Sequence, residues 1–247
     1  MTVFDLYGTY YDALYTDKDY LAETDYISAK LKASGLQAGN IFEFGCGTGK
    51  HGRRLGELGY QVYGIDLSQK MIDLAVTTEK FNCDQGDIRF FSLDRNFDAV
   101  ISLFHVMSYQ IDNASVNAVF CNASRHLNKG GLFIFDFWYQ PAVTTQIPAT
   151  RFKKIVTDEV VISRFAEPTL FPNENRVDVN YSITVADLQS KSIGEIEECH
   201  SMRYFSLPEI DLFCQLNGFK LKCSEEFLSG AVPSQDTWGV CVVLEKL

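Results

Sequence analysis

Between about residues 40 and 137, short apolar runs alternate with amphipathic segments. Four of these runs predict strands, namely Ile41 to Phe44, Gln61 to Asp66, Phe97 to Leu103 and Leu132 to Phe137. Three helices are expected between them, beginning near Thr48, Ser68 and Asp112, whose side chains can cap a helix N-terminus. Regular alternation of this kind predicts an α/β fold with a mostly parallel, doubly wound sheet that has helices on both faces.

The pattern changes after residue 150. Three β-rich runs separated by polar turns predict an inserted antiparallel sheet; they lie at 160–165, 176–186 and 191–205. A helix follows, with Pro208 in its first turn and Gly218 past its end, and two last strands can pair as a hairpin. We therefore expect an N-terminal helical lid (1–38), a cofactor-binding core (39–148), the inserted sheet (149–205), and a C-terminal helix and hairpin that complete the core (206–247).

Composition narrows the range of partners. The chain has 247 residues, 46% of them hydrophobic, and its 32 Asp and Glu against 22 Lys and Arg give a net charge of −10. An acidic chain without a basic run is a poor ligand for nucleic acid, because contacts to phosphate supply most of that affinity. The N-terminus is not that of a signal peptide, and the longest apolar run is too short to span a bilayer. We expect neither a nucleic acid nor a membrane as partner.

The cysteines indicate the compartment. There are seven, scattered along the chain with no C-x-x-C pair and no paired histidine spacing. An odd, scattered set is typical of reduced thiols in a cytoplasmic protein, and it predicts no metal site.

The stretch IFEFGCGTGKHG, residues Ile41 to Gly52, fits two cofactor fingerprints. Read from Gly47 it is the G-x-G-x-x-G of dinucleotide sites; read from Glu43 it is E-x-G-x-G-x-G, the spacing associated with S-adenosylmethionine. In a dinucleotide site the first glycine of the fingerprint directly follows the strand, so Gly47 could take that place only if the strand continued through Gly45. A glycine inside a strand weakens it, and we expect the strand to end at Phe44. The dinucleotide reading also gives no role to Glu43, a carboxylate that needs a partner in an apolar strand. Asp66 can accept hydrogen bonds from the ribose of either cofactor, so it does not discriminate between the two readings.

The loop with Glu43, together with Asp66, the Gly86 to Ile88 triplet and the closing hairpin, resembles class I S-adenosylmethionine-dependent methyltransferases, whose seven-stranded sheet ends in one antiparallel strand. The resemblance runs over nearly the whole chain. It implies S-adenosylmethionine as cofactor and S-adenosylhomocysteine as product. The cofactor-binding residues that it implies are Glu43, Gly45, Cys46, Gly47 and Gly49 for the methionine part, Asp66 for the ribose, Asp87 and Ile88 for the adenine, and Leu67, Met71 and Leu103 around the adenine and the sulfonium.

Six of the twelve tyrosines fall in the first 26 residues. Two readings fit this concentration: an amphipathic helix that packs on the core, for which Tyr7 and Tyr11 have the spacing, and a lid that closes over the cofactor, which is the one we expect. Tyr11 and Tyr20 are the lid residues expected to contact the cofactor. Tyr15 is expected nearer the acceptor.

Within the family, the YYDALY lid and the HLNKGG stretch are similar to small-molecule N-methyltransferases that modify amino sugars. That resemblance places Tyr15 and His126 near the acceptor nitrogen, although His126 could equally cap its own helix. His105, just after a strand end, is a second candidate base, and a core or surface role is as plausible for it. The last turn, SGAVPSQDTWG, has no basic residue to meet a pyrophosphate; Arg151, Lys153, Lys154 or Arg203 from the inserted sheet could substitute.

We therefore predict in-line methyl transfer to a small-molecule acceptor, with the amino group of a sugar or nucleotide sugar as the expected target. The inserted sheet is expected to be a substrate cover or a homodimer contact. Two alternatives are a nicotinamide-dependent oxidoreductase and a non-catalytic protein that binds S-adenosylmethionine.

Overall fold

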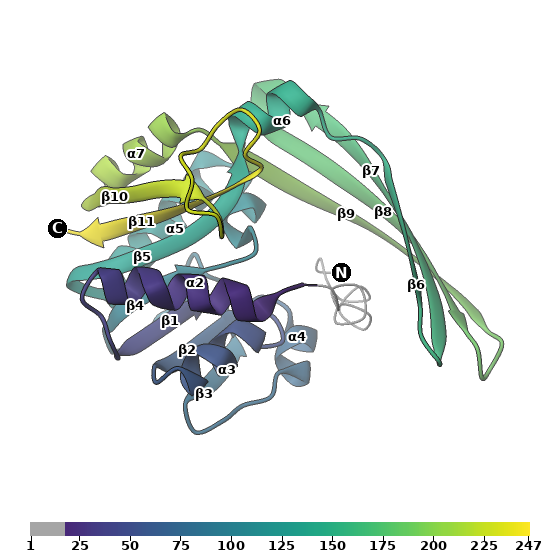
Figure 1. Cartoon of the computed structure of the whole chain (residues 1–247), viewed down its shortest axis with the longest axis horizontal. Helices are drawn as coiled ribbons and strands as arrows, with labels where there is room; N and C mark the ends of the chain where they lie inside the picture. The colour runs from purple at the N-terminus through teal and green to yellow at the C-terminus, as the bar shows by residue number, and fades with distance from the viewer. Residues whose placement is uncertain (1–17) are drawn as a thin grey trace.

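The computed structural model describes residues 18–247 (Figure 1). Seven of its strands form the core sheet: β1 (Asn40–Phe44), β2 (Gln61–Asp66), β3 (Phe81–Gln85), β4 (Phe97–Ser102), β5 (Leu127–Tyr139), β10 (Phe219–Glu226) and β11 (Gly239–Lys246). Their order is β3-β2-β1-β4-β5-β11-β10. β11 runs antiparallel to both of its neighbours, and the other six strands share one direction, so the mostly parallel, seven-stranded sheet expected from the sequence is confirmed.

Helices cover both faces of this sheet because its central strands are buried on both sides. On one face lie α2 (Tyr20–Ala33) and α3 (Lys50–Glu57), which pack with Ile41; on the other lie α5 (Asn113–His126) and α7 (Leu207–Leu216), which pack with Phe42 and Phe44. The short α4 (Gln69–Leu74) follows β2, and η2 (Val106–Tyr109) follows β4. Since side chains alternate along a strand, Glu43 points to the same face as Ile41.

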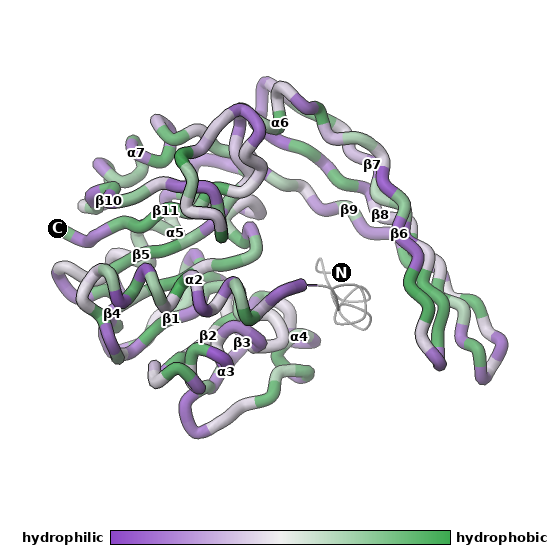
Figure 2. The backbone as a smooth tube through the Cα atoms, viewed as in Figure 1, coloured by the Kyte–Doolittle hydropathy of each residue, from purple (hydrophilic) through white to green (hydrophobic). Residues whose placement is uncertain are grey.

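The inserted sheet has four antiparallel strands: β6 (Arg151–Val156), β7 (Val160–Phe171), β8 (Arg176–Asp187) and β9 (Ile193–Phe205). The helix α6 (Gln140–Gln146) precedes it, and η3 (Pro172–Glu174) joins β7 to β8. The end of β9 pairs with the end of β5 through Trp138 and Tyr139, so the two sheets are continuous. Figure 1 shows the inserted sheet as a long arm that curves away from the core, and hydrophilic residues are interspersed along it (Figure 2).

Three predictions about elements are corrected. The helix expected near Thr48 begins at Lys50, because Gly49 is left-handed (φ 76°) and extends the preceding turn. The strands β3 and β6 were not predicted, since both are largely exposed and neither shows a run of apolar residues. Finally, β5 begins at Leu127, five residues before the predicted strand.

Across residues 18–247, no helix combines the length and the apolarity needed to cross a membrane.

Candidate functional site

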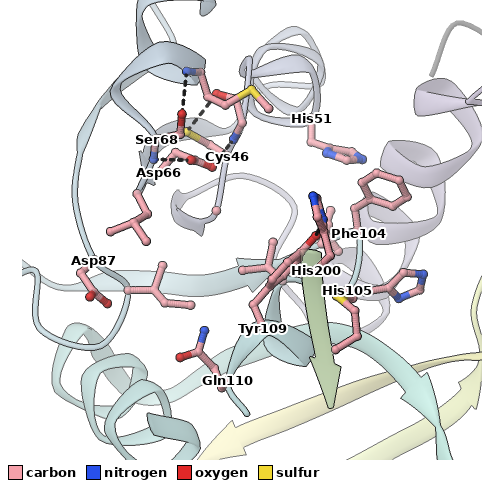
Figure 3. Close-up of a pocket in the computed structure, with 18 of the residues that line it drawn as sticks. Cys46, His51, Asp66, Ser68, Asp87, Phe104, His105, Tyr109, Gln110 and His200 are labelled. Carbon is pink, nitrogen blue, oxygen red and sulfur yellow. Dashed lines mark hydrogen bonds between the residues drawn. The ribbon is translucent and has the colours of Figure 1, made fainter. Parts of the chain in front are cut away.

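A cavity of about 810 Å³ lies at the carboxyl ends of β1, β2 and β4. This is the edge of an open α/β sheet at which ligands bind. Its opposite wall comes from the inserted sheet, through Val179, Tyr181, His200 and Met202. One cavity therefore extends from the glycine loop to the arm (Figure 3).

The glycine loop that follows β1 contributes backbone to this cavity. Gly45 and Cys46 both donate to the carbonyl of Ile65, at 2.8 and 2.9 Å, which fixes the loop against β2. A Cβ on Gly45 would stand 2.6 Å from the Val106 side chain, so this close approach requires glycine. Gly47 also lines the cavity and is left-handed (φ 54°). Glycines let the backbone come close to a ligand, and a nucleotide-type cofactor needs such a close approach at this position.

Asp66 holds the loop from the end of β2. Its Oδ2 accepts from the N–H of Gly47 and its Oδ1 from the N–H of Ser68, both at 2.9 Å (Figure 3). Burial raises the pKa of Asp66, and these two N–H groups oppose that rise. Asp66 lines the cavity and can offer a carboxylate oxygen to a ribose hydroxyl there.

Glu43 lies behind the loop and does not line the cavity. Its side chain is buried, and Oε1 lies 3.9 Å from Nδ1 of His51, which does line the cavity. Burial raises the pKa of Glu43 to about 8, although a hydrogen bond from the backbone N–H of Gly52 acts in the opposite direction. On its other side, His51 Nε2 lies 2.6 Å from Oε2 of Glu23 on α2. The side chain of Glu43 thus faces His51 behind the loop.

Gly52 lies inside α3, where a Cβ would stand 2.4 Å from the Phe81 ring and 2.5 Å from Oε2 of Glu43. It permits close packing of α3 on the sheet, which is also the role of the third glycine in a dinucleotide fingerprint, so Gly52 does not discriminate between the two readings. The departure from that fingerprint is at Gly47, which comes three residues after β1 ends at Phe44 instead of directly after the strand.

The residues expected around the adenine and the sulfonium meet on the cavity wall. Leu67, Met71, Ile88 and Leu103 all line it, as does Asp87. Arg89 donates to both carboxylate oxygens of Asp87, with Nη2 to Oδ2 at 2.6 Å. Burial raises the pKa of Asp87, but these bonds outweigh it and hold the pKa below its usual value.

Of the other expected cofactor residues, Cys46 and Tyr20 line the cavity. The ring of Tyr20 lies 5.0 Å from that of His51, between centroids. Gly49 does not line the cavity; a Cβ there would stand 2.3 Å from the Phe81 ring, so it serves the packing of the turn. Tyr11 and Tyr15 lie outside the described residues.

His105 lines the cavity and is paired with a buried carboxylate. Its Nδ1 lies 2.7 Å from Oδ2 of Asp136 on β5, and its backbone N–H donates to both oxygens of the same group at 3.2 Å. Burial raises the pKa of Asp136, but His105 outweighs this and holds the pKa below its ordinary value. A histidine oriented in this way by a carboxylate can accept a proton at its other nitrogen.

His126 does not lie in the cavity, and its expected place near the acceptor is corrected. It is buried at the end of α5, where Nε2 accepts from the N–H of Leu93 at 3.0 Å and Nδ1 lies 2.9 Å from the carbonyl of Asn122. Its ring packs against Phe42 at 5.2 Å. Burial lowers the pKa of His126, in keeping with a neutral ring that holds the loop before β4.

One polar chain in the cavity was not predicted. The hydroxyl of Tyr109, in η2, lies 2.9 Å from Nδ1 of His200 on β9 (Figure 3). His200 Nε2 lies 3.1 Å from Oε2 of Glu198. Tyr109 and His200 are 91 residues apart, so no local pattern in the sequence joins them. The one signal in the sequence is the alternation of side chains along β9, which predicts that His200 and Met202 share a face.

Over residues 18–247, no group of three or more His, Cys, Asp or Glu residues is arranged to hold a metal ion.

A family model described as a methyltransferase domain matches residues 41–131, the segment that contains the glycine loop, Asp66 and Asp87. Over 229 residues, the chain is 26% identical to a dTDP-3-amino-3,4,6-trideoxy-α-D-glucopyranose N,N-dimethyltransferase from Streptomyces venezuelae, and the match covers 92% of this chain and 93% of the relative.

Solved structures share the fold. An S-adenosylmethionine-dependent methyltransferase from Clostridium acetobutylicum aligns with a TM-score of 0.80 and 21% identity, over 96% of both chains. An amino pentose methyltransferase from Micromonospora echinaspora, solved with S-adenosylmethionine bound, aligns with a TM-score of 0.78 and 21% identity, over 100% of this chain and 99% of that one. These likenesses place the cavity on a methyltransferase fold.

Proposed function

Since the chain is an S-adenosylmethionine-dependent methyltransferase, we propose that it methylates the amino group of a sugar. The observation that carries this proposal is the shape of the cavity, which joins the glycine loop to an acceptor wall built by the inserted sheet. The similarity to a sugar N,N-dimethyltransferase over 92% of the chain supports an amine as target.

The residues at the loop end fit the cofactor. The backbone at Gly45 and Gly47 can approach the amino-acid part of the cofactor closely, and the carboxylate of Asp66 can accept from its ribose. An apolar surface for the adenine and the sulfonium is formed by Met71, Ile88 and Leu103. When bound there, S-adenosylmethionine supplies a methyl group on a sulfonium, and S-adenosylhomocysteine remains after in-line transfer to the amine.

The acceptor amine must be neutral when it attacks, and it must lose one proton. Two groups on the cavity wall can take that proton. His105, held at Nδ1 by Asp136, can accept it at Nε2. Tyr109 can take it at its oxygen as its own hydroxyl proton passes to Nδ1 of His200, which lies 2.9 Å away. Because charge disperses in this reaction, the protein contributes mainly alignment and exclusion of water.

A product assay tests the proposal. The full-length protein is incubated with S-adenosylmethionine and matched pairs of sugars that differ only in an amino or a hydroxyl group at one carbon. We expect S-adenosylhomocysteine release and a sugar that gains methyl mass with the amino member of a pair, and none with the hydroxyl member. Tight cofactor binding without turnover on any acceptor would favour a non-catalytic binding protein. Turnover with the hydroxyl members alone would contradict N-methylation.

We also infer that this enzyme acts on small molecules in the cytoplasm. All seven cysteines are free, which suits a reducing compartment. Cell fractionation tests this location, and recovery in an oxidising compartment would contradict it.

A further inference from the structure

Three neighbouring strands place Glu43, Gly64 and Cys83 in one row across the core sheet. Glu43 on β1 pairs with Gly64 on β2, and Gly64 pairs with Cys83 on β3. Paired residues on neighbouring strands point to the same face of a sheet, so Cys83 lies on the same face as Glu43 and packs with the core on that side. Because Gly64 has no side chain, the middle of this row is open to a side chain from elsewhere.

Cys46 fills the middle of the row from the glycine loop. A Cβ on Gly64 would stand 2.7 Å from the Cβ and 2.8 Å from the Sγ of Cys46, so the cysteine occupies the place of the missing side chain. Neighbouring strands are only about 4.8 Å apart, which brings Cys46 beside Cys83. The thiol of Cys46 hydrogen-bonds to the sulfur of Cys83. Cys46 and Cys83 therefore form a thiol pair that no C-x-x-C spacing announces.

The two sulfurs of this thiol pair differ in environment. Cys46 is 5% exposed, whereas Cys83 is half-buried. The hydrogen bond from Cys46 lowers the pKa of Cys83, although burial and the carboxylates of Asp84 and Asp66 act in the opposite direction. The same bond, together with burial, raises the pKa of Cys46. Cys83 is thus the more accessible sulfur and the one that more readily becomes a thiolate, which is the reactive form of cysteine.

The other five cysteines are in different surroundings. Burial raises the pKa of four of them, namely Cys199, Cys214, Cys223 and Cys241. Cys121 is exposed, and its thiol donates to Oδ1 of Asn217 at 3.1 Å. A raised pKa disfavours the thiolate, so among residues 18–247 the geometry that favours oxidation is that of the thiol pair.

Cys46 belongs to the loop that the cofactor needs. It lies between Gly45 and Gly47 and lines the cavity (Figure 3). Its backbone N–H donates to the carbonyl of Ile65 at 2.9 Å, and the next N–H, that of Gly47, donates to Asp66. A covalent S–S bond is only about 2.0 Å long, so its formation draws two hydrogen-bonded sulfurs together. Movement of Cys46 toward β3 therefore displaces the backbone that approaches the cofactor.

We propose that Cys46 and Cys83 form a reversible disulfide that weakens the binding of S-adenosylmethionine, so that peroxide switches the enzyme off. The inference concerns the cofactor end of the cavity and holds whichever acceptor the enzyme methylates. Transient, redox-sensing disulfides are the kind found where thiols are otherwise kept reduced, which agrees with seven free cysteines in the chain.

The reaction uses hydrogen peroxide as the oxidant and takes two steps. In the first, the thiolate of Cys83 attacks one oxygen and the O–O bond breaks; Cys83 becomes a sulfenic acid, and hydroxide leaves as water with the proton that the Cys83 thiol had released. In the second, the sulfur of Cys46 attacks the sulfur of Cys83. The S–S bond forms, the S–O bond breaks, and hydroxide leaves as a second water with the proton of the Cys46 thiol. The two sulfurs lose two electrons to the peroxide, and a dithiol reductant returns them.

The test detects the bond and measures its effect on the cofactor site separately. The full-length protein is treated with hydrogen peroxide, the excess is removed with catalase, and free thiols are alkylated before peptide mass mapping. We expect two peptides joined through Cys46 and Cys83, with the loss of two hydrogen atoms. The calorimetric affinity for S-adenosylhomocysteine should fall by at least about tenfold on oxidation and return with dithiothreitol. S-adenosylhomocysteine present during oxidation should slow formation of the bond, because coupling between two sites is reciprocal.

Two variants distinguish the thiol pair from oxidation elsewhere. Cys83→Ser removes the sulfur that reacts first and leaves Cys46 in the loop. After peroxide treatment, its affinity for S-adenosylhomocysteine should stay within about twofold of its value before treatment. Cys121→Ser removes an exposed thiol that does not line the cavity, and it should respond to peroxide as the wild-type protein does.

A wild-type peptide map in which Cys121 is oxidised while Cys46 and Cys83 stay unlinked would overturn the proposal without any variant. A linked pair with unchanged affinity for S-adenosylhomocysteine would show that the bond is not a switch. A loss of affinity that persists in Cys83→Ser would assign the effect to another group, such as the thioether of Met71 on the cavity wall, and would also overturn the proposal. None of these outcomes depends on transfer to a sugar amine, so they are distinct from those of the product assay.

Discussion

His126 is fixed inside the protein by a hydrogen bond at each ring nitrogen. The N–H of Leu93 donates to Nε2, so the ring proton is on Nδ1 and faces the carbonyl of Asn122. His126→Ala leaves the buried N–H of Leu93 without an acceptor and opens a cavity beside Phe42. We expect the free energy of unfolding to fall by about 2 to 3 kcal/mol, measured by urea titration, with kcat unchanged. A large loss of kcat at unchanged stability would return His126 to a catalytic role.

Glu43 makes stability depend on pH. Its pKa is about 8 in the folded protein, against 4.5 ordinarily, so the folded state keeps a proton that the unfolded state releases. The free energy of unfolding therefore falls as pH rises from about 4.5 to 8 and is flat above, with a total cost of a few kcal/mol at most. Glu43→Gln cannot release that proton.

Urea unfolding at pH 5 and pH 8.5 checks this prediction. The wild-type protein should lose more stability across that interval than Glu43→Gln does. Equal losses in the two proteins would show that Glu43 is already ionised in the folded state.

Residues whose roles follow from local sequence were predictable. Gly45 and Gly47 lie in the turn after β1 and Asp66 ends β2, and strand ends meet at one edge of a parallel sheet. The residue pairs that complete the acceptor end of the cavity were not predictable from local sequence. Asp136 lies 31 residues from His105, and His200 lies 91 residues from Tyr109. No periodicity within an element encodes contacts of that range.

The turn between β1 and α3 tolerates a side chain at some positions and not at others. Gly45→Ala would place a Cβ 2.6 Å from Val106 and force apart the turn and η2. We expect affinity for S-adenosylmethionine, measured calorimetrically, to fall by at least about tenfold.

Gly130→Ala is the matched control for Gly45→Ala. Gly130 has φ 78°, close to the 73° of Gly45, but a Cβ there would meet nothing within 4 Å. Its backbone strain is similar, but it meets no side chain and does not line the cavity. Comparable losses of affinity in the two variants would mean that general destabilisation, rather than this contact, explains the effect.

Strand prediction succeeded where both faces of a strand are buried and failed at edges. β2 has the predicted bounds, Gln61–Asp66, because an apolar run between turns is unambiguous there. β3 and β6 are the outermost strands of their sheets and are largely exposed, so tertiary pairing rather than composition defines them. The inserted sheet was predicted to be a substrate cover or a dimer contact, and both remain predictions; four of its residues line the cavity wall.

The contact between Tyr109 and His200 joins the core to the arm across the cavity. Tyr109→Phe removes the hydroxyl and leaves the ring. We expect kcat with an amine acceptor to fall by about tenfold or more and its pH profile to change, while affinity for S-adenosylhomocysteine is kept. Tyr63→Phe is the control, because Tyr63 does not line this cavity and its hydroxyl bonds Asp84. A pH profile of kcat unchanged by Tyr109→Phe would leave His105 as the base.

We propose that one cavity brings S-adenosylmethionine and a sugar amine together. The most direct measurement uses S-adenosylmethionine labelled with ¹³C in its methyl group, an amino sugar as acceptor, and NMR of the product. We expect the label on the sugar nitrogen, and we expect Asp66→Ala to slow its appearance by weakening cofactor binding. Label on oxygen or carbon, or no transfer although the cofactor is bound, would contradict it.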